Sequence, residues 1–271
     1  MRRLVPYLLG LYIFLLTIAV GTLALGGTPP PVLTPFSTLA GFAFALTHAV
    51  VRMGWKRALG LLGLVFVISM AFESIGVATG RIYGPYHYTP KLGPLFLGLV
   101  PYLIAVAWFM MMYPSFVISD WLIPPAWKRW QRMLSVAAVG GLVMTAWDVV
   151  MDPLMVAGDH WVWEIGGAFF GIPLLNYWGW WLTVFVIFAL FLLFTKGKTA
   201  LVSDPRFDRL VVISYTMTGL GEVIAANSIG LPGPALAGLL AMLPWMITGW
   251  LKMSEEPAGS AEASPNKTSS Q

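Results

Sequence analysis

The chain has 271 residues, of which 58% are hydrophobic and 10% are charged, and its mean hydropathy is +0.78. Soluble domains carry about 25% charged residues, so this composition excludes an ordinary soluble domain and predicts a polytopic membrane protein. The formal net charge of +4 comes from basic residues in short loops between apolar runs, a pattern that favours a role in membrane topology over nucleic-acid binding.

Eight apolar segments follow one another along the chain, and most reach the ~20 residues that a membrane-spanning helix needs. The first follows Arg2 and Arg3 and is longer than the apolar core of a signal peptide, so we interpret it as a membrane helix. The second has only 17 residues, and the fourth contains Pro94, Pro101 and Pro114, so these two are the least regular. The predicted spans are residues 4–25, 35–51, 58–79, 94–119, 132–151, 174–195, 208–228 and 233–251.

The basic residues test this number of spans. If the N-terminus is cytoplasmic, 14 of the 16 Lys and Arg residues fall on the cytoplasmic side, and only Arg81 and Lys91 fall on the outer side. By the positive-inside rule we expect an all-α integral membrane bundle of about eight transmembrane helices, with both termini cytoplasmic, in the cytoplasmic membrane. Residues 1–253 are expected to form one transmembrane domain, and the polar residues 254–271 a disordered cytoplasmic tail.

Four carboxylates, Glu73, Asp148, Asp152 and Glu222, lie near the predicted outer ends of odd-numbered spans. Insertion scales charge ~2.5–3.5 kcal/mol for an Asp at the centre of a membrane helix, so such residues usually face a protein interior and mark function. Asp148 and Asp152 are one helical turn apart and share a helix face.

Three interpretations of the Asp148/Asp152 pair stay open. The pair can supply a general acid with a supporting carboxylate, because burial and a like charge both favour the protonated form. Alternatively, Asp152 lies at the membrane interface before Pro153 and only Asp148 is buried. A third interpretation is half of a magnesium site like those of intramembrane prenyltransferases, although the chain lacks a second Asp-rich motif and a nearby basic patch.

The outer loops supply polar partners for these acids. Glu73 and Glu222 each stand alone in an apolar segment, and their simplest role is to pair with Arg81 or to accept hydrogen bonds from the Tyr83–Tyr88 loop. The inner halves of the spans hold almost no ionisable residue except His48. We therefore expect one polar cluster in the outer half of the bundle, which includes Arg81, Tyr83, His87, Tyr88 and Asn176.

Tryptophans crowd the outer ends of the fifth and sixth spans, and most of them are expected to form an interfacial aromatic belt. Trp147 and Trp163, however, flank the acids. An aromatic face stabilises a cation by about 0.5–2 kcal/mol, so rings beside an acid suit a reaction that passes through a carbocation.

The residue inventory also limits the chemistry. The chain has no cysteine, which excludes disulfides, thiolate nucleophiles, Cys-ligated zinc and iron–sulfur clusters. Its three histidines are too few for the multi-histidine sites of membrane di-iron enzymes. We expect a reaction that uses neither a metal nor another cofactor.

Several separated motifs resemble the membrane carotenoid biosynthesis family of carotenoid 1,2-hydratases, which includes the bisanhydrobacterioruberin hydratases. The resemblance covers residues 40–195 well and the last two spans loosely. Its motifs are Glu73-Ser-Ile-Gly-Val-Ala-Thr-Gly-Arg81-Ile-Tyr-Gly-Pro-Tyr-His-Tyr88, Leu92-Gly-Pro94, Ala107-Trp-Phe-Met-Met-Met-Tyr-Pro114, Trp147-Asp148-x3-Asp152-Pro153 and Trp161-x-Trp163-x3-Gly167-x3-Gly171-Ile-Pro-x2-Asn176-Tyr-x-Gly-Trp180.

The resemblance implies cofactor-free addition of water across the terminal double bond of an acyclic carotenoid, within the lipid bilayer and in contact with other enzymes of carotenoid synthesis. From position alone, we assign Asp148 as the proton donor and Asp152 or Glu73 as its support and the group that orients water. Trp147 and Trp163 would line the cation, and Tyr83, His87 and Asn176 would hold water or the other acids.

Two alternatives remain at this point. An acid-initiated carotenoid cyclase would protonate the same end group but close a ring in place of adding water. A proton-coupled transporter would also bury acids, but it should offer polar residues along both halves of the bundle.

Overall fold

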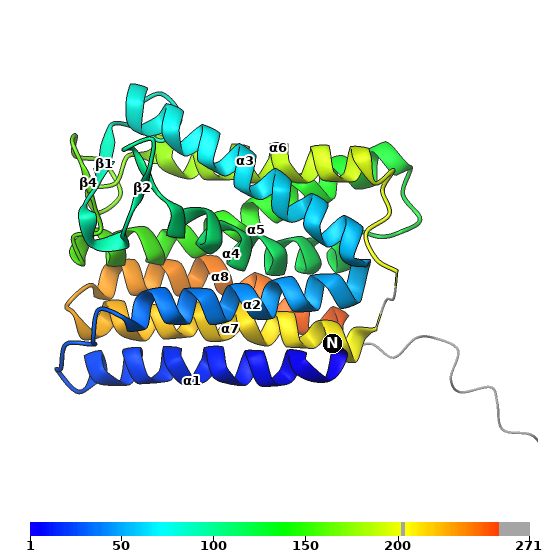
Figure 1. Cartoon of the computed structure of the whole chain (residues 1–271), viewed down its shortest axis with the longest axis horizontal. Helices are drawn as coiled ribbons and strands as arrows, with labels where there is room; N and C mark the ends of the chain where they lie inside the picture. The colour runs from blue at the N-terminus through cyan, green and yellow to red at the C-terminus, as the bar shows by residue number, and fades with distance from the viewer. Residues whose placement is uncertain (202–203, 255–271) are drawn as a thin grey trace, which may run out of the picture.

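The protein is a bundle of long helices in the computed structural model, which describes residues 1–201 and 204–254. Within these residues, eight helices are long and apolar enough to cross a membrane, and they run side by side (Figure 1). This confirms the prediction of an all-α polytopic bundle with eight spans. The helices are Val5–Ala24 (α1), Leu33–Met53 (α2), Trp55–Thr79 (α3), Tyr102–Leu122 (α4), Arg129–Ala157 (α5), Leu174–Phe194 (α6), Pro205–Ser228 (α7) and Pro232–Lys252 (α8).

The two ends of the bundle differ. The short strands lie at one end, which we name the outer end, and the N-terminus lies at the other, which we name the inner end (Figure 1). A one-turn 3-10 helix, Arg2–Leu4 (η1), precedes α1 at the inner end. The predicted disordered tail comprises residues 254–271, and all of it after Ser254 lies outside the described residues.

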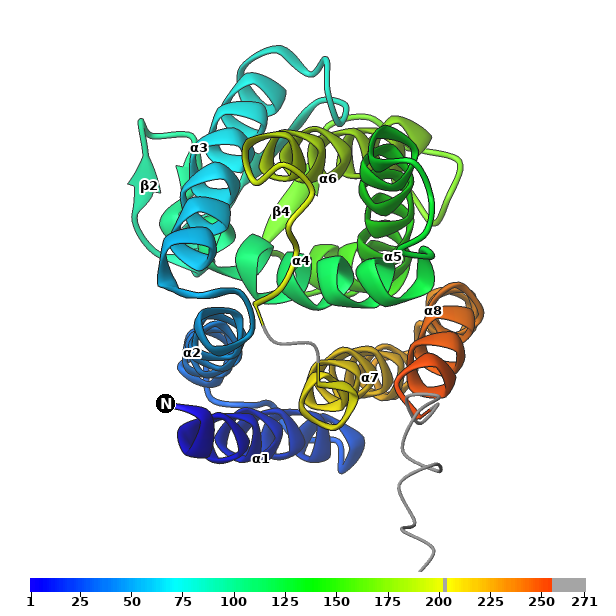
Figure 2. The ribbon, with the colours of Figure 1, turned by 90° about the vertical axis from the view of Figure 1, so that its right-hand side faces the viewer.

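The helices form two groups. Viewed from the inner end, α3, α4, α5 and α6 surround a common core, and α1, α2, α7 and α8 lie along one side of it (Figure 2). Helix α4 packs against α2, α3, α5, α7 and α8, and its residues 108–120 are all buried. Helix α4 therefore contacts both groups, and α5 also joins them by packing against α7 and α8.

Local sequence explains where several helices begin and end. The Asp204 side chain accepts hydrogen bonds from the N–H groups of Arg206 (3.0 Å) and Phe207 (3.2 Å), and Pro205 occupies the first turn of α7, where its missing N–H costs nothing. Helix α3 ends at Gly80, whose φ of 67° is left-handed and suits glycine. The chain turns there into the outer loops.

The fourth span starts later than predicted, at Tyr102 and not at residue 94. Leu95–Phe96 (β2) and Val100–Pro101 (β3) pair as a short antiparallel hairpin before the helix begins. Proline is readily accepted just before a helix but not within its continuous hydrogen-bond ladder. Pro94 and Pro101 both lie before the first residue of α4, so neither interrupts the helix. Pro114 is the one of the three prolines that lies inside α4.

The fifth span is longer than predicted and continues to Ala157, past Pro153. Asp152 therefore lies within the helix, with only 1% of its surface exposed. The interpretation that only Asp148 of the pair is buried is wrong.

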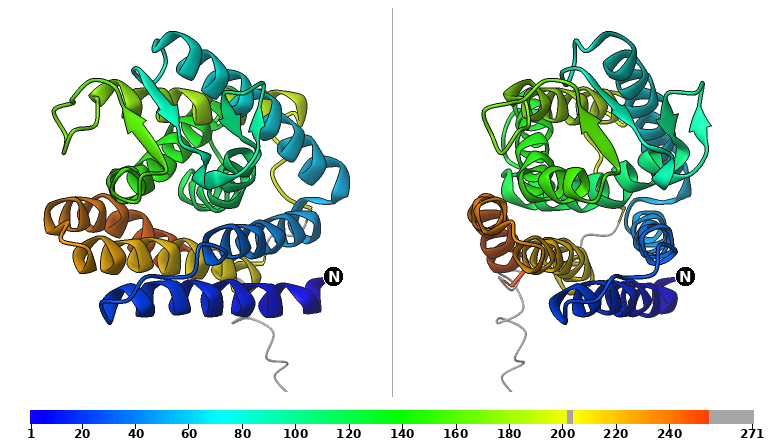
Figure 3. Two further views of the ribbon diagram at one scale, coloured as in Figure 1. Left: turned by 60° about the vertical axis from the view of Figure 1, so that its left-hand side comes forward. Right: turned by 90° about the vertical axis from the view of Figure 1, so that its left-hand side faces the viewer.

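Two short strands cover the outer end (Figure 3). Tyr86–Tyr88 (β1) and Trp161–Trp163 (β4) pair in antiparallel register, with Tyr86 opposite Trp163 and Tyr88 opposite Trp161. A 3-10 helix, Pro90–Leu92 (η2), follows β1. Because side chains alternate along a strand, these four aromatic rings face the bundle and the residues between them face away. We name β1 and β4 together the outer cap.

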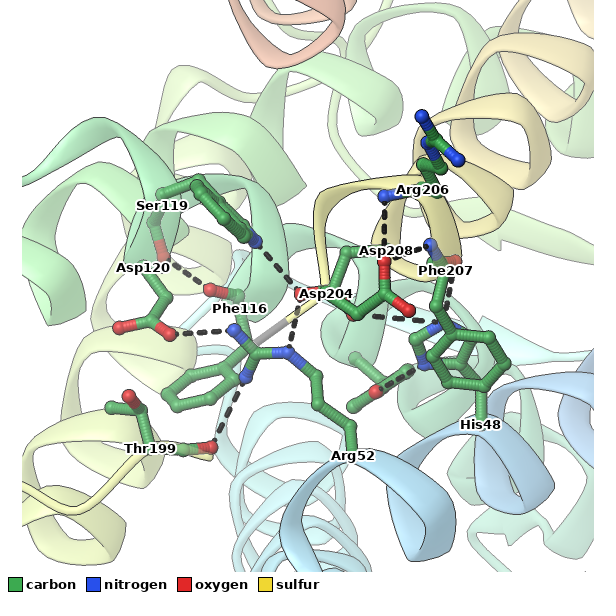
Figure 4. A network of polar contacts seen from close by, with 12 residues as sticks. His48, Arg52, Phe116, Ser119, Asp120, Thr199, Asp204, Arg206, Phe207 and Asp208 are labelled. Atoms are coloured by element: carbon green, nitrogen blue, oxygen red, sulfur yellow. Dashed lines mark hydrogen bonds and ion pairs between the residues drawn. The ribbon is translucent and has the colours of Figure 1, made fainter. Parts of the chain in front are cut away.

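A buried ionic network holds the inner end together. Arg52 on α2 donates to Asp120 on α4 (2.7 Å), to Asp208 on α7 (2.8 Å) and to the carbonyl of Thr199 (3.1 Å), as Figure 4 shows. Arg132 on α5 also pairs with Asp120. The network therefore ties both helix groups to each other.

This network corrects the expectation that the inner half holds almost no ionisable residue. The predicted spans ended at residues 51 and 119 and began at 132 and 208, which left these charges at or beyond the ends. In the structure α2, α4, α5 and α7 each extend by two or three residues, and the charges lie between them. His48 lies beside this network: its Nε2 is 3.8 Å from Oδ1 of Asp208, and its Nδ1 is 2.6 Å from the hydroxyl of Tyr113.

Replacing Arg52 by Leu is expected to destabilise the bundle strongly, because Asp208 then keeps a buried carboxylate without its arginine. Breaking a buried ion pair in this way costs about 3–5 kcal/mol. Thermal unfolding in detergent measures the loss. Arg206→Leu, an exposed arginine at the same end, is the matched control, and equal unfolding temperatures for the two variants would contradict the assigned role of the network.

The membrane orientation can be read by cysteine labelling, because the chain has no native cysteine. From the charge bias we expect His87→Cys to react with a membrane-impermeant maleimide on intact cells. Lys196→Cys at the inner end should react only after the cells are permeabilised. The reverse pattern would overturn the prediction that both termini are cytoplasmic.

Candidate functional site

A cavity of about 220 Å³ lies in the outer half of the bundle, with the outer cap among its walls. Seven of the eight helices contribute to its lining, α8 being the exception among the described helices. Its wall is mainly apolar and aromatic. The polar and aromatic residues that line it are Tyr12, Thr34, Ser37, Thr38, Glu73, Tyr83, Tyr86, Tyr88, Trp108, Trp147, Asp152, Trp161, Trp163, Asn176, Trp180, Thr218 and Glu222.

Asp152 faces this cavity and is surrounded by N–H donors. Its Oδ1 accepts hydrogen bonds from the indoles of Trp161 (2.7 Å) and Trp163 (3.2 Å), both in the outer cap. Its Oδ2 accepts from Nδ2 of Asn176 (2.8 Å) on α6. Three neutral donors thus replace the water that a carboxylate would otherwise need.

Asp148 lies one turn earlier on α5 and is fully buried, and it is not among the residues that line the cavity. Its Oδ2 accepts from the same Nδ2 of Asn176 (2.7 Å), whereas its Oδ1 has no partner among the described residues. The amide of Asn176 therefore bridges the two aspartates.

Glu73 on α3 has a similar set of donors. Its Oε2 accepts from the hydroxyls of Tyr86 and Tyr88, the latter at 2.9 Å, and its Oε1 accepts from the indole of Trp108 (3.0 Å). Burial, followed by the neighbouring Glu73 carboxylate, raises the pKa of both tyrosines well above its usual value. Both phenols therefore keep their protons and act as donors to Glu73.

Glu222 on α7 is held more loosely. Its Oε2 accepts one hydrogen bond, from the indole of Trp147 (2.6 Å). Its side chain lines the cavity near Thr218, which bonds to the hydroxyl of Tyr12 on α1 (2.7 Å). Of the three acids on the cavity wall, Glu222 has the fewest hydrogen-bond donors.

The acids of the cavity have no basic partner among the described residues. Among the described residues that line the cavity, none is Lys, Arg or His. The negative charge of the site is stabilised by indole, phenol and amide groups only. A cation formed inside the cavity would therefore meet carboxylates that are not already neutralised.

Aromatic rings form much of the wall. Trp180 stacks on Trp108 with ring centroids 4.2 Å apart and meets the edge of Trp147 at 5.9 Å. Tyr86 packs against Trp163 at 5.0 Å. These rings present π faces and edges around the three acids.

Most of the residues predicted from sequence come together here. Glu73, Asp152, Glu222, Trp147, Trp163, Tyr83, Tyr88 and Asn176 line the cavity, and Asp148 lies directly behind Asn176. Tyr83 does not hold an acid, because its hydroxyl pairs with Thr183 on α6 (2.8 Å).

Two predicted residues lie outside the site. His87 is the middle residue of β1, so it points away from the bundle, and its exposed side chain lies 3.4 Å from Glu164. Arg81 is exposed and forms no ion pair with Glu73 in the described part of the chain. The alternation Tyr-His-Tyr in residues 86–88 is typical of a strand, and in a strand His87 points to the opposite face from Tyr86 and Tyr88.

Tyr86 lies in the Tyr83–Tyr88 loop, from which Glu73 was expected to accept hydrogen bonds, and its hydroxyl donates to Glu73. Three tryptophans were not predicted as site residues: Trp108, Trp161 and Trp180. Each belongs to a motif that carries the family resemblance, but an indole in a membrane protein is equally at home in an interfacial belt. Their role depends on which carboxylate each one meets, and that follows only from the pairing of distant segments.

The magnesium interpretation finds no geometric support. Both aspartates accept from the NH2 group of Asn176, a donor that would repel a cation at that place. Among the described residues, no group of three or more His, Asp or Glu side chains is arranged to hold a metal ion.

Two matches with known proteins concern carotenoid biosynthesis. Residues 33–244 match the family described as carotenoid biosynthesis protein. The bisanhydrobacterioruberin hydratase of Haloarcula japonica is 35% identical over 137 residues, which are 50% of this chain and 45% of that protein. The match thus spans less than half the length of that relative. No solved structure matches the chain.

Proposed function

This chain belongs to the carotenoid biosynthesis protein family, and on that premise we propose that it adds water across the terminal C1–C2 double bond of an acyclic carotenoid, which gives a tertiary 1-hydroxy group. A relative whose name is a hydratase supports hydration of a carotenoid as the type of reaction. The closer assignment rests on the cavity.

The observation that carries the proposal is a cluster of acids without cations. Hydration of an unactivated alkene requires a strong acid, walls that tolerate a carbocation and a base that takes a proton from water. The cavity offers three carboxylates, several aromatic rings and, among its described lining residues, no Lys, Arg or His.

We assign the proton donor to Glu222. A carboxylate that accepts several hydrogen bonds is stabilised as the anion, whereas one with few donors is stabilised as the neutral acid. Asp152 and Glu73 accept three hydrogen bonds each, and Glu222 accepts one. Asp148, which the sequence favoured as the donor, is assigned a positioning role through Asn176, because it does not reach the cavity.

The reaction then runs in two steps. Glu222 gives its proton to C2, the double bond breaks, and the positive charge develops at the tertiary carbon C1. The rings of Trp147, Trp163 and Trp180 and the anions of Asp152 and Glu73 stabilise that cation. The oxygen of a water molecule bonds to C1 and passes a proton to Asp152, and transfer of this proton back to Glu222 restores the site. The sum is addition of one water.

The cavity volume supports an end-on mode of binding. At about 220 Å³ it is smaller than the ~300–1,000 Å³ of pockets that enclose a drug-sized ligand, so it suits the end of a carotenoid and not the whole rod. Leu16, Ala19, Val20 and Leu23 of α1 form a partly exposed apolar wall along which the remaining polyene can reach the bilayer.

The alternatives differ in their products. A cyclase would use the same acid but lose a proton from the cation, so its product keeps the mass of the substrate. A proton-coupled transporter would make no new pigment. The charges at the inner end, which sequence did not place there, are engaged in ion pairs with one another and do not by themselves favour transport.

Expression in a host that makes lycopene, with mass spectrometry of the pigments, tests the reaction. The parent chain should add the mass of one water, and Glu222→Gln should reduce the rate of product formation by about 10²–10⁴-fold, the usual contribution of a general acid. Glu164→Gln, an exposed acid at the same end, is the matched control. Full activity of Glu222→Gln would contradict the assigned donor, and a product without added mass would contradict hydration.

Trp180 tests the stabilisation of the cation, because its indole N–H makes no hydrogen bond in the described residues and only its ring can contribute. Trp180→Leu should slow the reaction by about 2–30-fold, the equivalent of 0.5–2 kcal/mol, and Trp180→Phe should retain most of the rate. Trp178→Leu, an exposed tryptophan on the same helix, serves as the control. Equal rates for Trp180→Leu and Trp180→Phe would argue against a role for the π face.

A further inference from the structure

A second cavity, of about 540 Å³, lies at the inner end of the bundle. It is enclosed by the connection between α4 and α5 and by residues 197–200 after α6, and the buried network residues Arg52 and Asp120 form part of its wall. Arg129, Arg132 and Lys198 also line it. Four of its thirteen lining residues are thus basic and one is acidic.

The charges of this cavity do not cancel. Arg52 and Arg132 are balanced by Asp120 and Asp208, with which they form ion pairs. Arg129 and Lys198 have no ion-pair partner among the described residues. The wall therefore carries an excess of two positive charges that favours an anion.

Hydrogen-bond donors are also available there. The buried Nε of Arg132 has no acceptor among the described residues. The 29-residue helix α5 begins at Arg129, and Lys128 before it provides no side-chain cap for the first N–H groups. The helix N-terminus adds partial positive charge to that of the side chains.

An exposed tryptophan beside the cavity points to the source of the anion. Trp127, which lines the cavity, is 48% exposed, as expected for an aromatic belt at the level of lipid head groups. We propose that this cavity binds a phosphate group, and that anionic phospholipids of the surrounding membrane supply it. This proposal is independent of the reaction at the outer end.

Native mass spectrometry of the full chain in detergent tests it, with phosphatidylglycerol and phosphatidylcholine of the same acyl chains as the two lipids. The parent should bind phosphatidylglycerol preferentially. A basic residue near an anionic surface contributes about 1 kcal/mol, or about five-fold in affinity, so Arg129→Gln/Lys198→Gln should weaken phosphatidylglycerol binding by about 25-fold.

The matched control is Lys128→Gln/Lys196→Gln, which removes the same charge from the neighbouring positions that do not line the cavity, and its affinity should stay within about two-fold of the parent. Equal losses in both double variants, or no preference of the parent for phosphatidylglycerol, would overturn the proposal. Inorganic phosphate, added to the lipid-bound protein, distinguishes the two sources of the phosphate group. Displacement of the lipid supports the same site with a soluble source, and failure to displace it supports the lipid as the source.

Discussion

Ionised side chains inside a membrane-spanning bundle lose the hydration that water gives them, and protein groups must replace it. This protein meets that requirement differently at its two ends. At the inner end, arginines and aspartates from four helices neutralise one another. At the outer end, carboxylates are held by indole, phenol and amide donors, and the described lining residues include no basic side chain. The first arrangement joins helices, and the second leaves negative charge available to a ligand.

The two arrangements share the helix α4. Its inner end carries Asp120, which receives both Arg52 and Arg132, and its outer half carries Trp108, which donates to Glu73 and supports Trp180. Because α4 is buried on most sides, a shift at one end cannot be absorbed by solvent and must be taken up by its neighbours. The rigid ionic end thus helps to hold the geometry of the acid cavity.

Sequence was sufficient for the number of spans and for most of the acids in the site, because hydropathy, charge bias and the cost of a buried carboxylate are local signals. It failed where a property depends on distant segments. The predicted spans stopped two or three residues short at the inner end, near Arg52, Asp120 and Arg132, because a charge near the end of a span is interpreted as interfacial until its partner is known. Likewise, nothing local distinguishes Trp161, which holds Asp152, from Trp178, which is exposed.

The pairing of β1 with β4 affects how a ligand can enter and leave the cavity. The two strands carry Tyr86 and Tyr88, which hold Glu73, and Trp161 and Trp163, which hold Asp152, so the donors of both acids belong to one small sheet. Lifting that sheet would strip four hydrogen bonds from two buried carboxylates at the same moment. Such an opening is costly, because it leaves buried carboxylates without hydrogen-bond donors. The substrate of the proposed function is apolar and dissolves in the bilayer, so under that proposal it is expected to enter and leave along the lipid-facing flank at α1 and not through the outer cap.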